Sequence, residues 1–136
     1  AAMGAGAAAA YNPGTEGDLQ KLLADTNGGV AGAADFVGAE GSLKFATGAL
    51  RRGGGVKGVG LFGGALSQPI PMFPFRAMSI SGSMTGTLED TREMLETVKA
   101  GKINPIPVET RDMSEASRTL DDLREGNIIG RVVLKN

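Results

Sequence analysis

The most specific chemical motif in the sequence is Gly58-Val59-Gly60-Leu61-Phe62-Gly63, which matches the G-x-G-x-x-G pattern of dinucleotide-binding loops. That pattern binds a pyrophosphate only where a helix begins within it, because the first amides of the helix meet the phosphate oxygens. The next residues include Pro69 and Pro71, and no helix is expected to begin there. We therefore interpret these glycines as the end of a strand whose backbone another group approaches closely.

Two charged residues lie within apolar segments and need partners. Asp35 follows Ala33-Ala34 and precedes Phe36-Val37-Gly38. Its carboxylate either accepts backbone N–H bonds near the end of a sheet or acts as a catalytic acid; the absence of a nearby His, Lys or metal ligand favours the structural role. Arg131 lies in an apolar terminal segment, where its guanidinium pairs with a carboxylate or with the phosphate of a ligand.

The composition excludes several classes of chemistry. The 136 residues include no Cys and no His, which excludes disulfides, thiolate and Ser-His-Asp catalysis, and metal sites built on nitrogen or sulfur. Lys and Arg number 14 against 15 Asp and Glu, and this balance argues against a nucleic-acid or membrane partner. The pairs Glu89/Asp90 and Asp121/Asp122 are interpreted as solvated helix faces and as charges at helix N-termini. The first residues lack an initiator Met and a basic segment, so we expect part of a longer protein and no signal peptide.

Short apolar runs alternate with capped amphipathic helices along the chain. The predicted strands are residues 7–11, 33–37, 56–61, 78–83 and 128–134. The predicted helices are residues 15–26, 39–50, 87–100 and 112–126. Residues 62–74 are predicted to form a surface loop with buried Phe73 and Phe75. This alternation predicts one α/β unit over residues 1–136 with a mainly parallel sheet.

The order of several segments resembles the second half of the coenzyme domain of zinc-type medium-chain alcohol dehydrogenases. The resemblance extends from about Gly4 to Leu134. The segments that carry the resemblance are Asp35-Phe36-Val37-Gly38, Ala49 to Gly54, Val59 to Gly64, Ile80-Ser81-Gly82-Ser83, Lys99 to Ile103, Leu123 to Gly126 and Gly130 to Leu134. The resemblance implies a partial Rossmann-like, doubly wound sheet. The first βαβ unit of the family, with its glycine loop and ribose-binding acid, and the zinc-binding catalytic domain are absent from this sequence. Lys57 and Gly58 depart from the family by interrupting a strand that is usually apolar.

The family's activity implies hydride transfer between an alcohol, aldehyde or ketone and NAD or NADP, with zinc only in the missing catalytic domain. This segment would supply no catalytic or metal-binding residue and would be inactive alone. The resemblance places the nicotinamide end of the cofactor against three strand ends and the pyrophosphate against an arginine. The implied cofactor-binding residues are Val37, Gly38, Val59, Gly60, Leu61, Ser83, Met84, Thr85 and Arg131.

The resemblance also implies a homo-oligomer joined through the strand Ile80–Ser83, a cytoplasmic location, and a small alcohol or carbonyl compound as substrate. Two alternatives stay open from the residues alone. One is a zinc-free quinone or enoyl reductase of the same superfamily. The other is a non-catalytic α/β module that dimerises, for which a large exposed apolar surface would be the sign.

Overall fold

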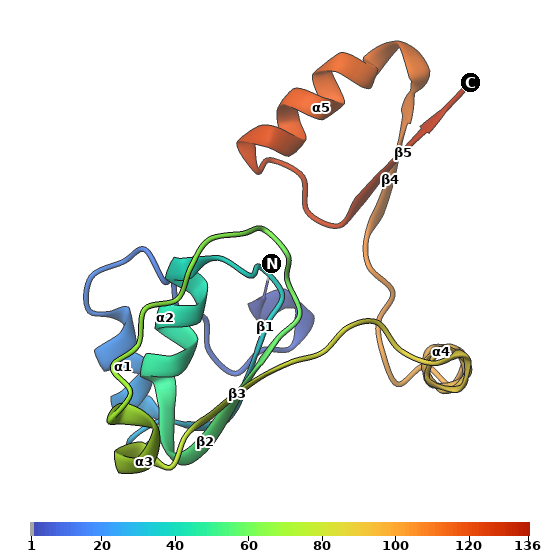
Figure 1. Cartoon of the computed structure of the whole chain (residues 1–136). Coiled ribbons are helices and arrows are strands. Elements are labelled where there is room, and N and C mark those ends of the chain that lie inside the picture. The colour runs from blue at the N-terminus through green and yellow to red at the C-terminus, as the bar shows by residue number, and fades with distance from the viewer. Residues whose placement is uncertain (1) are drawn as a thin grey trace. The chain divides into compact units, whose positions relative to one another are not determined.

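The computed structural model describes residues 2–136, which form two compact units (Figure 1). One unit comprises residues 9–85, and the other comprises residues 2–8 together with residues 86–136. Among the described residues, no helix has the length and apolar character needed to cross a membrane.

The unit of residues 9–85 is built on a parallel sheet of three strands in the order β1-β2-β3. The strands are β1 (Val30–Asp35), β2 (Leu50–Gly58) and β3 (Ser79–Gly82). Ala33, Val56 and Ile80 are in register and lie on the side of the sheet that faces the core. Lys57 alternates with Val56 and is exposed on the opposite side. The polar residue that departs from the family pattern is thus accommodated, because its side chain points to solvent.

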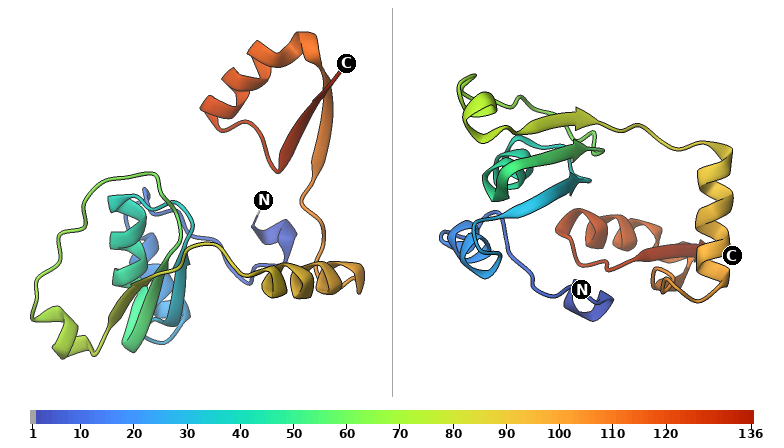
Figure 2. Two further views of the ribbon diagram at one scale, coloured as in Figure 1. Left: turned by 45° about the vertical axis from the view of Figure 1, so that its right-hand side comes forward. Right: turned by 90° about the horizontal axis from the view of Figure 1, so that it is seen from below.

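Three helices accompany this sheet: α1 (Asp18–Asp25), α2 (Glu40–Ala49) and α3 (Met72–Arg76). The helix α2 packs on β1 and β2, α1 packs on α2, and α3 packs on β2 (Figure 2). Leu43 and Ala46, one turn apart on α2, contact the core formed by Leu50, Val56 and Met78. This is the apolar stripe that the spacing of the sequence predicts.

The unit that contains residues 86–136 has a helix α4 (Leu88–Lys99) and a parallel pair of strands, β4 (Val108–Asp112) and β5 (Arg131–Lys135). The helix α5 (Ala116–Glu125) connects the two strands, and short 3-10 helices lie at Met3–Ala5 and Met113–Glu115. Thr87, the residue before α4, forms a capping box with Asp90. The Thr87 hydroxyl accepts the Asp90 N–H at 3.1 Å, and the Asp90 carboxylate accepts the Thr87 N–H at 2.7 Å.

The α/β class and the parallel pairing of the strands are confirmed, as are the four predicted helices. The strand predicted at residues 7–11 is wrong. No neighbouring strand in the described part of the chain pairs with that segment, and a run of four alanines has low β-propensity. The strand β4 was missed because its sequence, Val-Glu-Thr-Arg-Asp, is mostly polar and the expected strands are apolar runs.

Several predicted boundaries are also wrong. The strand β2 begins at Leu50, six residues before the predicted start, and its pairing with β1 is irregular between Val30 and Gly32. The strand β5 begins at Arg131 because Gly130 adopts a left-handed backbone with φ of 92°. The predicted loop contains the short helix α3; Phe73 packs against the core, but Phe75 is 71% exposed.

Candidate functional site

Two loops meet at the carboxyl ends of β1 and β2. The backbone carbonyl of Asp35, the last residue of β1, accepts the N–H of Val59 at 2.8 Å and of Gly60 at 3.0 Å. The carbonyl of Val37 accepts the Phe62 N–H at 3.1 Å. The structure therefore brings together two of the three stretches that the family resemblance names, although they are more than 20 residues apart in sequence.

Gly38 and Gly60 make the closest approach between these loops. A β-carbon on Gly38 would lie 2.0 Å from the carbonyl oxygen of Gly60, and Gly38 has a left-handed φ of 72°. A β-carbon on Gly60 would lie 2.1 Å from the carbonyl carbon of Val37 and 2.4 Å from the Gly38 nitrogen. Both distances are far below van der Waals contact, so neither position has room for a side chain. The group that approaches the glycine-rich end of β2 is the loop after β1. No helix follows the G-x-G-x-x-G motif before residue 72.

Asp35 orders the first of these loops. Its side chain is buried, and its carboxylate accepts the N–H of Val37 at 2.9 Å, the N–H of Gly38 at 3.2 Å and the hydroxyl of Ser42 at 3.0 Å. Burial by itself would raise the pKa of this carboxyl, but the three hydrogen bonds outweigh burial and hold the pKa below its usual value. The structural role predicted for Asp35, acceptance of backbone N–H bonds at the end of the sheet, is confirmed.

The third stretch follows β3. The N–H of Ser83 donates to the carbonyl of Gly58 at 2.9 Å, so Ser83 extends the pairing of β3 with β2. Met84 and Thr85 are exposed, and Thr85 adopts a left-handed φ of 49°, a conformation that is rare for a β-branched residue. The ends of the three parallel strands lie at one edge of the sheet, which is where open α/β sheets bind ligands.

The loop after β2 offers backbone groups for a ligand. Within residues 2–136, neither the carbonyl of Val59 nor the N–H of Leu61 makes a backbone or side-chain hydrogen bond. Leu61 and Phe62 are 89% and 83% exposed, and Phe36 across from them is 75% exposed. The only titratable side chain in the two loops is that of Asp35, which is already occupied by three donors. This edge can therefore bind and orient a partly apolar ligand through the backbone, and it has no free acid or base.

Arg131 begins β5, in the other unit. Its N–H donates to the Pro107 carbonyl at 2.9 Å, and its side chain is exposed. Of the carboxylates in residues 2–136, none lies within 4.0 Å of the Arg131 guanidinium, although seven other ion pairs are present. Within this described range, Arg131 therefore does not form the intramolecular salt bridge that was one of its two predicted roles.

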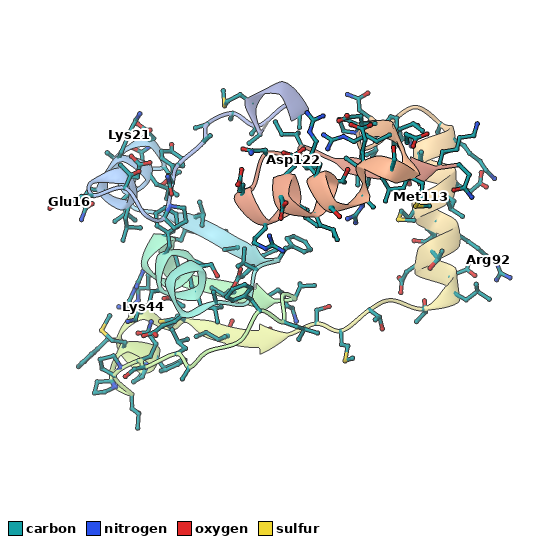
Figure 3. All side chains as sticks on the ribbon, turned by 90° about the horizontal axis from the view of Figure 1, so that it is seen from above. Glu16, Lys21, Lys44, Arg92, Met113 and Asp122 are labelled. Atoms are coloured by element: carbon teal, nitrogen blue, oxygen red, sulfur yellow. The ribbon has the colours of Figure 1, made fainter. Side chains whose placement is uncertain are left out.

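A different arginine makes the ion-pair network of that unit. Arg111 on β4 bonds to Asp122 on α5 and to Glu109, each at 2.7 Å, and its side chain is only 13% exposed. The pKa of Glu109 is lowered, first by the hydrogen bond from Arg111. Asp122, labelled in Figure 3, was predicted to be solvated; it is instead a partner of Arg111 that attaches α5 to β4. No sequence signal marks this pairing, because the two residues are 11 positions apart on different elements.

Comparison with known proteins identifies the family. A family model described as zinc-binding dehydrogenase matches residues 1–100. The chain belongs to the zinc-binding dehydrogenase family. It is 35% identical over 124 residues to an alcohol dehydrogenase of Geobacillus stearothermophilus, and 30% identical over 135 residues to an NAD-dependent alcohol dehydrogenase of Saccharolobus solfataricus. These alignments cover 90% and 98% of this chain, but only 36% and 39% of the respective relatives.

Solved structures of alcohol dehydrogenases share the fold of this family member. The enzyme of the archaeon Aeropyrum pernix aligns with a TM-score of 0.78 and 28% identity, over 89% of this chain and 35% of that protein. A putative alcohol dehydrogenase of Sinorhizobium meliloti aligns with a TM-score of 0.81 over 98% of this chain and 38% of its own; at 22% identity it shows the fold alone.

The metal in the family's name does not fit the residues of this chain. Protein zinc sites are built from Cys, His and carboxylate ligands, and this sequence has neither Cys nor His. Within residues 2–136, no group of three or more carboxylates lies close enough together to hold a metal ion. The described residues of this family member therefore offer no zinc ligand set.

Proposed function

We propose that this segment orients the nicotinamide end of NAD in a dehydrogenase that transfers hydride between an alcohol and the cofactor. The observation that carries the proposal is the contact of the Gly38 and Gly60 loops at the carboxyl edge of the sheet, beside a free backbone acceptor and a free backbone donor. The names of the relatives support NAD as cofactor and an alcohol as substrate, and they favour an alcohol dehydrogenase over a zinc-free quinone reductase.

The backbone of the loop after β2 has the right polarity for a carboxamide. A carboxamide has an NH₂ donor and a carbonyl acceptor, which are the complements of the free Val59 carbonyl and the free Leu61 N–H. Two such hydrogen bonds would fix one rotation of the nicotinamide ring and so present one face of it to the substrate. Bound NAD supplies the hydride acceptor, and the loops after β1 and β3 would complete the surface against which the ring lies.

Two further residue sets belong to the proposal. Arg131, which has no carboxylate partner in residues 2–136, would bind the cofactor diphosphate, because a guanidinium matches two phosphate oxygens. The strand β3 is an edge strand of its sheet, and the segment Ile80–Ser83 would join two copies of the protein by pairing the two edges.

The test uses the complete protein that contains this segment. NADH formation from a series of small alcohols is followed at 340 nm, and NADH binding by fluorescence, in the wild type and in Gly60→Ala. We expect NAD-dependent oxidation in the wild type and a large loss of kcat in the variant, because the added methyl group separates the two loops. A wild type that neither binds NADH nor oxidises alcohols would overturn the proposal.

A further inference from the structure

We propose that Asp35 is a positioning residue for the nicotinamide, acting through the backbone of both loops; this inference rests on the proposed function. Asp35 does not reach a ligand, since its side chain is only 5% exposed. It would determine instead whether the groups that do reach the ligand are held in the correct orientation.

Asp35 holds the loop after β1 with its side chain and the loop after β2 with its backbone carbonyl. Its carboxylate receives the N–H groups of Val37 and Gly38 from the loop after β1. Its backbone carbonyl receives the N–H groups of Val59 and Gly60 from the loop after β2. The Val59 carbonyl belongs to the same peptide group as the Gly60 N–H, which donates to Asp35. On the other side of the Leu61 N–H, the Phe62 N–H donates to the Val37 carbonyl, so both free groups lie in a stretch anchored to the end of β1.

Ser42 completes this arrangement from the helix α2. Its hydroxyl lies 3.0 Å from both the Asp35 carboxylate and the Ala39 carbonyl. The hydroxyl has one proton, and the charged acceptor makes the stronger bond, so the proton goes to Asp35. The Ser42 oxygen accepts the Ala39 N–H at 3.2 Å in return. No role for Ser42 was predicted from the sequence. The sequence feature that could have indicated one is its position seven residues after Asp35, in the first turn of the helix that follows β1.

The carboxylate is specifically required by this geometry. Among the described residues no cation lies within 4.0 Å of Asp35, so its charge is stabilised by N–H and O–H donors alone. An asparagine in the same place keeps one acceptor oxygen. Its NH₂ group either faces the Gly38 N–H, or faces Ser42, whose hydroxyl must then accept from the amide and donate to the Ala39 carbonyl instead. In both cases the loop after β1 loses its hydrogen bonds to a charged acceptor and is held more weakly, while the fold of β1 is kept.

The experiment compares Asp35→Asn and Ser42→Ala in the complete protein with Glu40→Gln as a matched control. Glu40 also lies on α2 but is exposed and pairs only with Lys44, at 2.6 Å. For each protein, kcat, the dissociation constant of NADH and that of ADP-ribose are measured. ADP-ribose lacks the nicotinamide, so its binding reports on the remainder of the cofactor site. Hydrogen exchange of the peptide containing residues 36–39 reports on the loop itself.

For Asp35→Asn we expect faster exchange at residues 36–39 and a kcat lowered roughly 10- to 100-fold, the effect of a misplacement of about 1 Å. NADH affinity should fall severalfold while ADP-ribose affinity stays unchanged. Ser42→Ala should show a smaller change of the same kind, and Glu40→Gln none.

Equal losses of NADH and ADP-ribose affinity, or a lower Tm with unchanged kcat, would show a purely structural role and overturn the inference. If Asp35→Asn does not fold, Ser42→Ala decides by the same criteria. Failure of the proposed function is a separate result, seen in the wild type alone as binding of ADP-ribose and NADH with equal affinity and no alcohol oxidation.

Discussion

Gly38 and Gly60 occupy each other's side-chain space: a β-carbon on either one would lie between 2.0 and 2.4 Å from backbone atoms of the opposite loop. This reciprocal contact joins the ends of β1 and β2. It explains why the chain has glycine at both positions independently of any ligand.

Gly60→Ala should therefore lower both stability and activity. The overlap is with backbone atoms, which move only if the loops separate, and overpacking of this kind costs about 1–3 kcal/mol of unfolding free energy. Urea unfolding and kcat measure the two effects. The control is Gly58→Ala, because a β-carbon there would lie 4.0 Å from its nearest neighbour, the Ser81 carbonyl. Equal effects of the two substitutions would contradict the steric explanation.

The stability contributed by Asp35 should depend on pH. Its pKa is lower in the folded protein than in the unfolded chain, where it is about 3.9. The contribution is then fully present above about pH 4 and is lost as the pH falls through the lower, folded-state pKa. Asp35→Asn should be destabilised by about 1–3 kcal/mol at pH 7, and its difference from the wild type should shrink below pH 4. Urea unfolding between pH 2.5 and 7 measures this difference, and a constant gap across the range would contradict it.

Arg131→Ala in the complete protein should raise the dissociation constant of the cofactor roughly 10- to 150-fold, the effect of losing a charge-assisted pair. Arg131→Lys should recover only part of the affinity, because an ammonium group does not reproduce the guanidinium fork. Arg124→Ala is the control, since Arg124 is exposed on α5 and pairs with Asp121. Unchanged affinity with a lower Tm would instead make Arg131 a structural residue.

Arg111→Gln should lower the Tm, and the loss should exceed that of Arg118→Gln. Arg111 is 13% exposed and bonds to Asp122, Thr119 and Glu109, whereas Arg118 is 73% exposed and bonds only to Glu115. Exposed ion pairs such as Arg118–Glu115 contribute little to stability, whereas the largely buried Arg111–Asp122 pair attaches α5 to β4. Calorimetry of the two variants measures the difference, and equal Tm values would show that the Arg111 network does not stabilise this unit.

The features that the sequence determined are those set by neighbouring residues. The helix predicted from residue 87 begins there, with Thr87 as its N-cap, and Gly126 ends α5 with a left-handed φ of 77°, as predicted. These interactions span three or four residues, so a local pattern is sufficient to predict them. The role of Asp35 was also accessible, because a lone carboxylate in an apolar strand must accept nearby N–H groups.

The tertiary structure alone decided the strands and the geometry of the candidate site. The polar segment of β4 becomes a strand because β5 pairs with it, and the apolar segment of residues 7–11 stays irregular because no described strand does. The contact of Gly38 with Gly60, and the bond from Ser42 to Asp35, likewise depend on where β1, β2 and α2 meet. Strand pairing and loop contacts join residues that are distant in sequence, so their energy does not appear in any local pattern of residues.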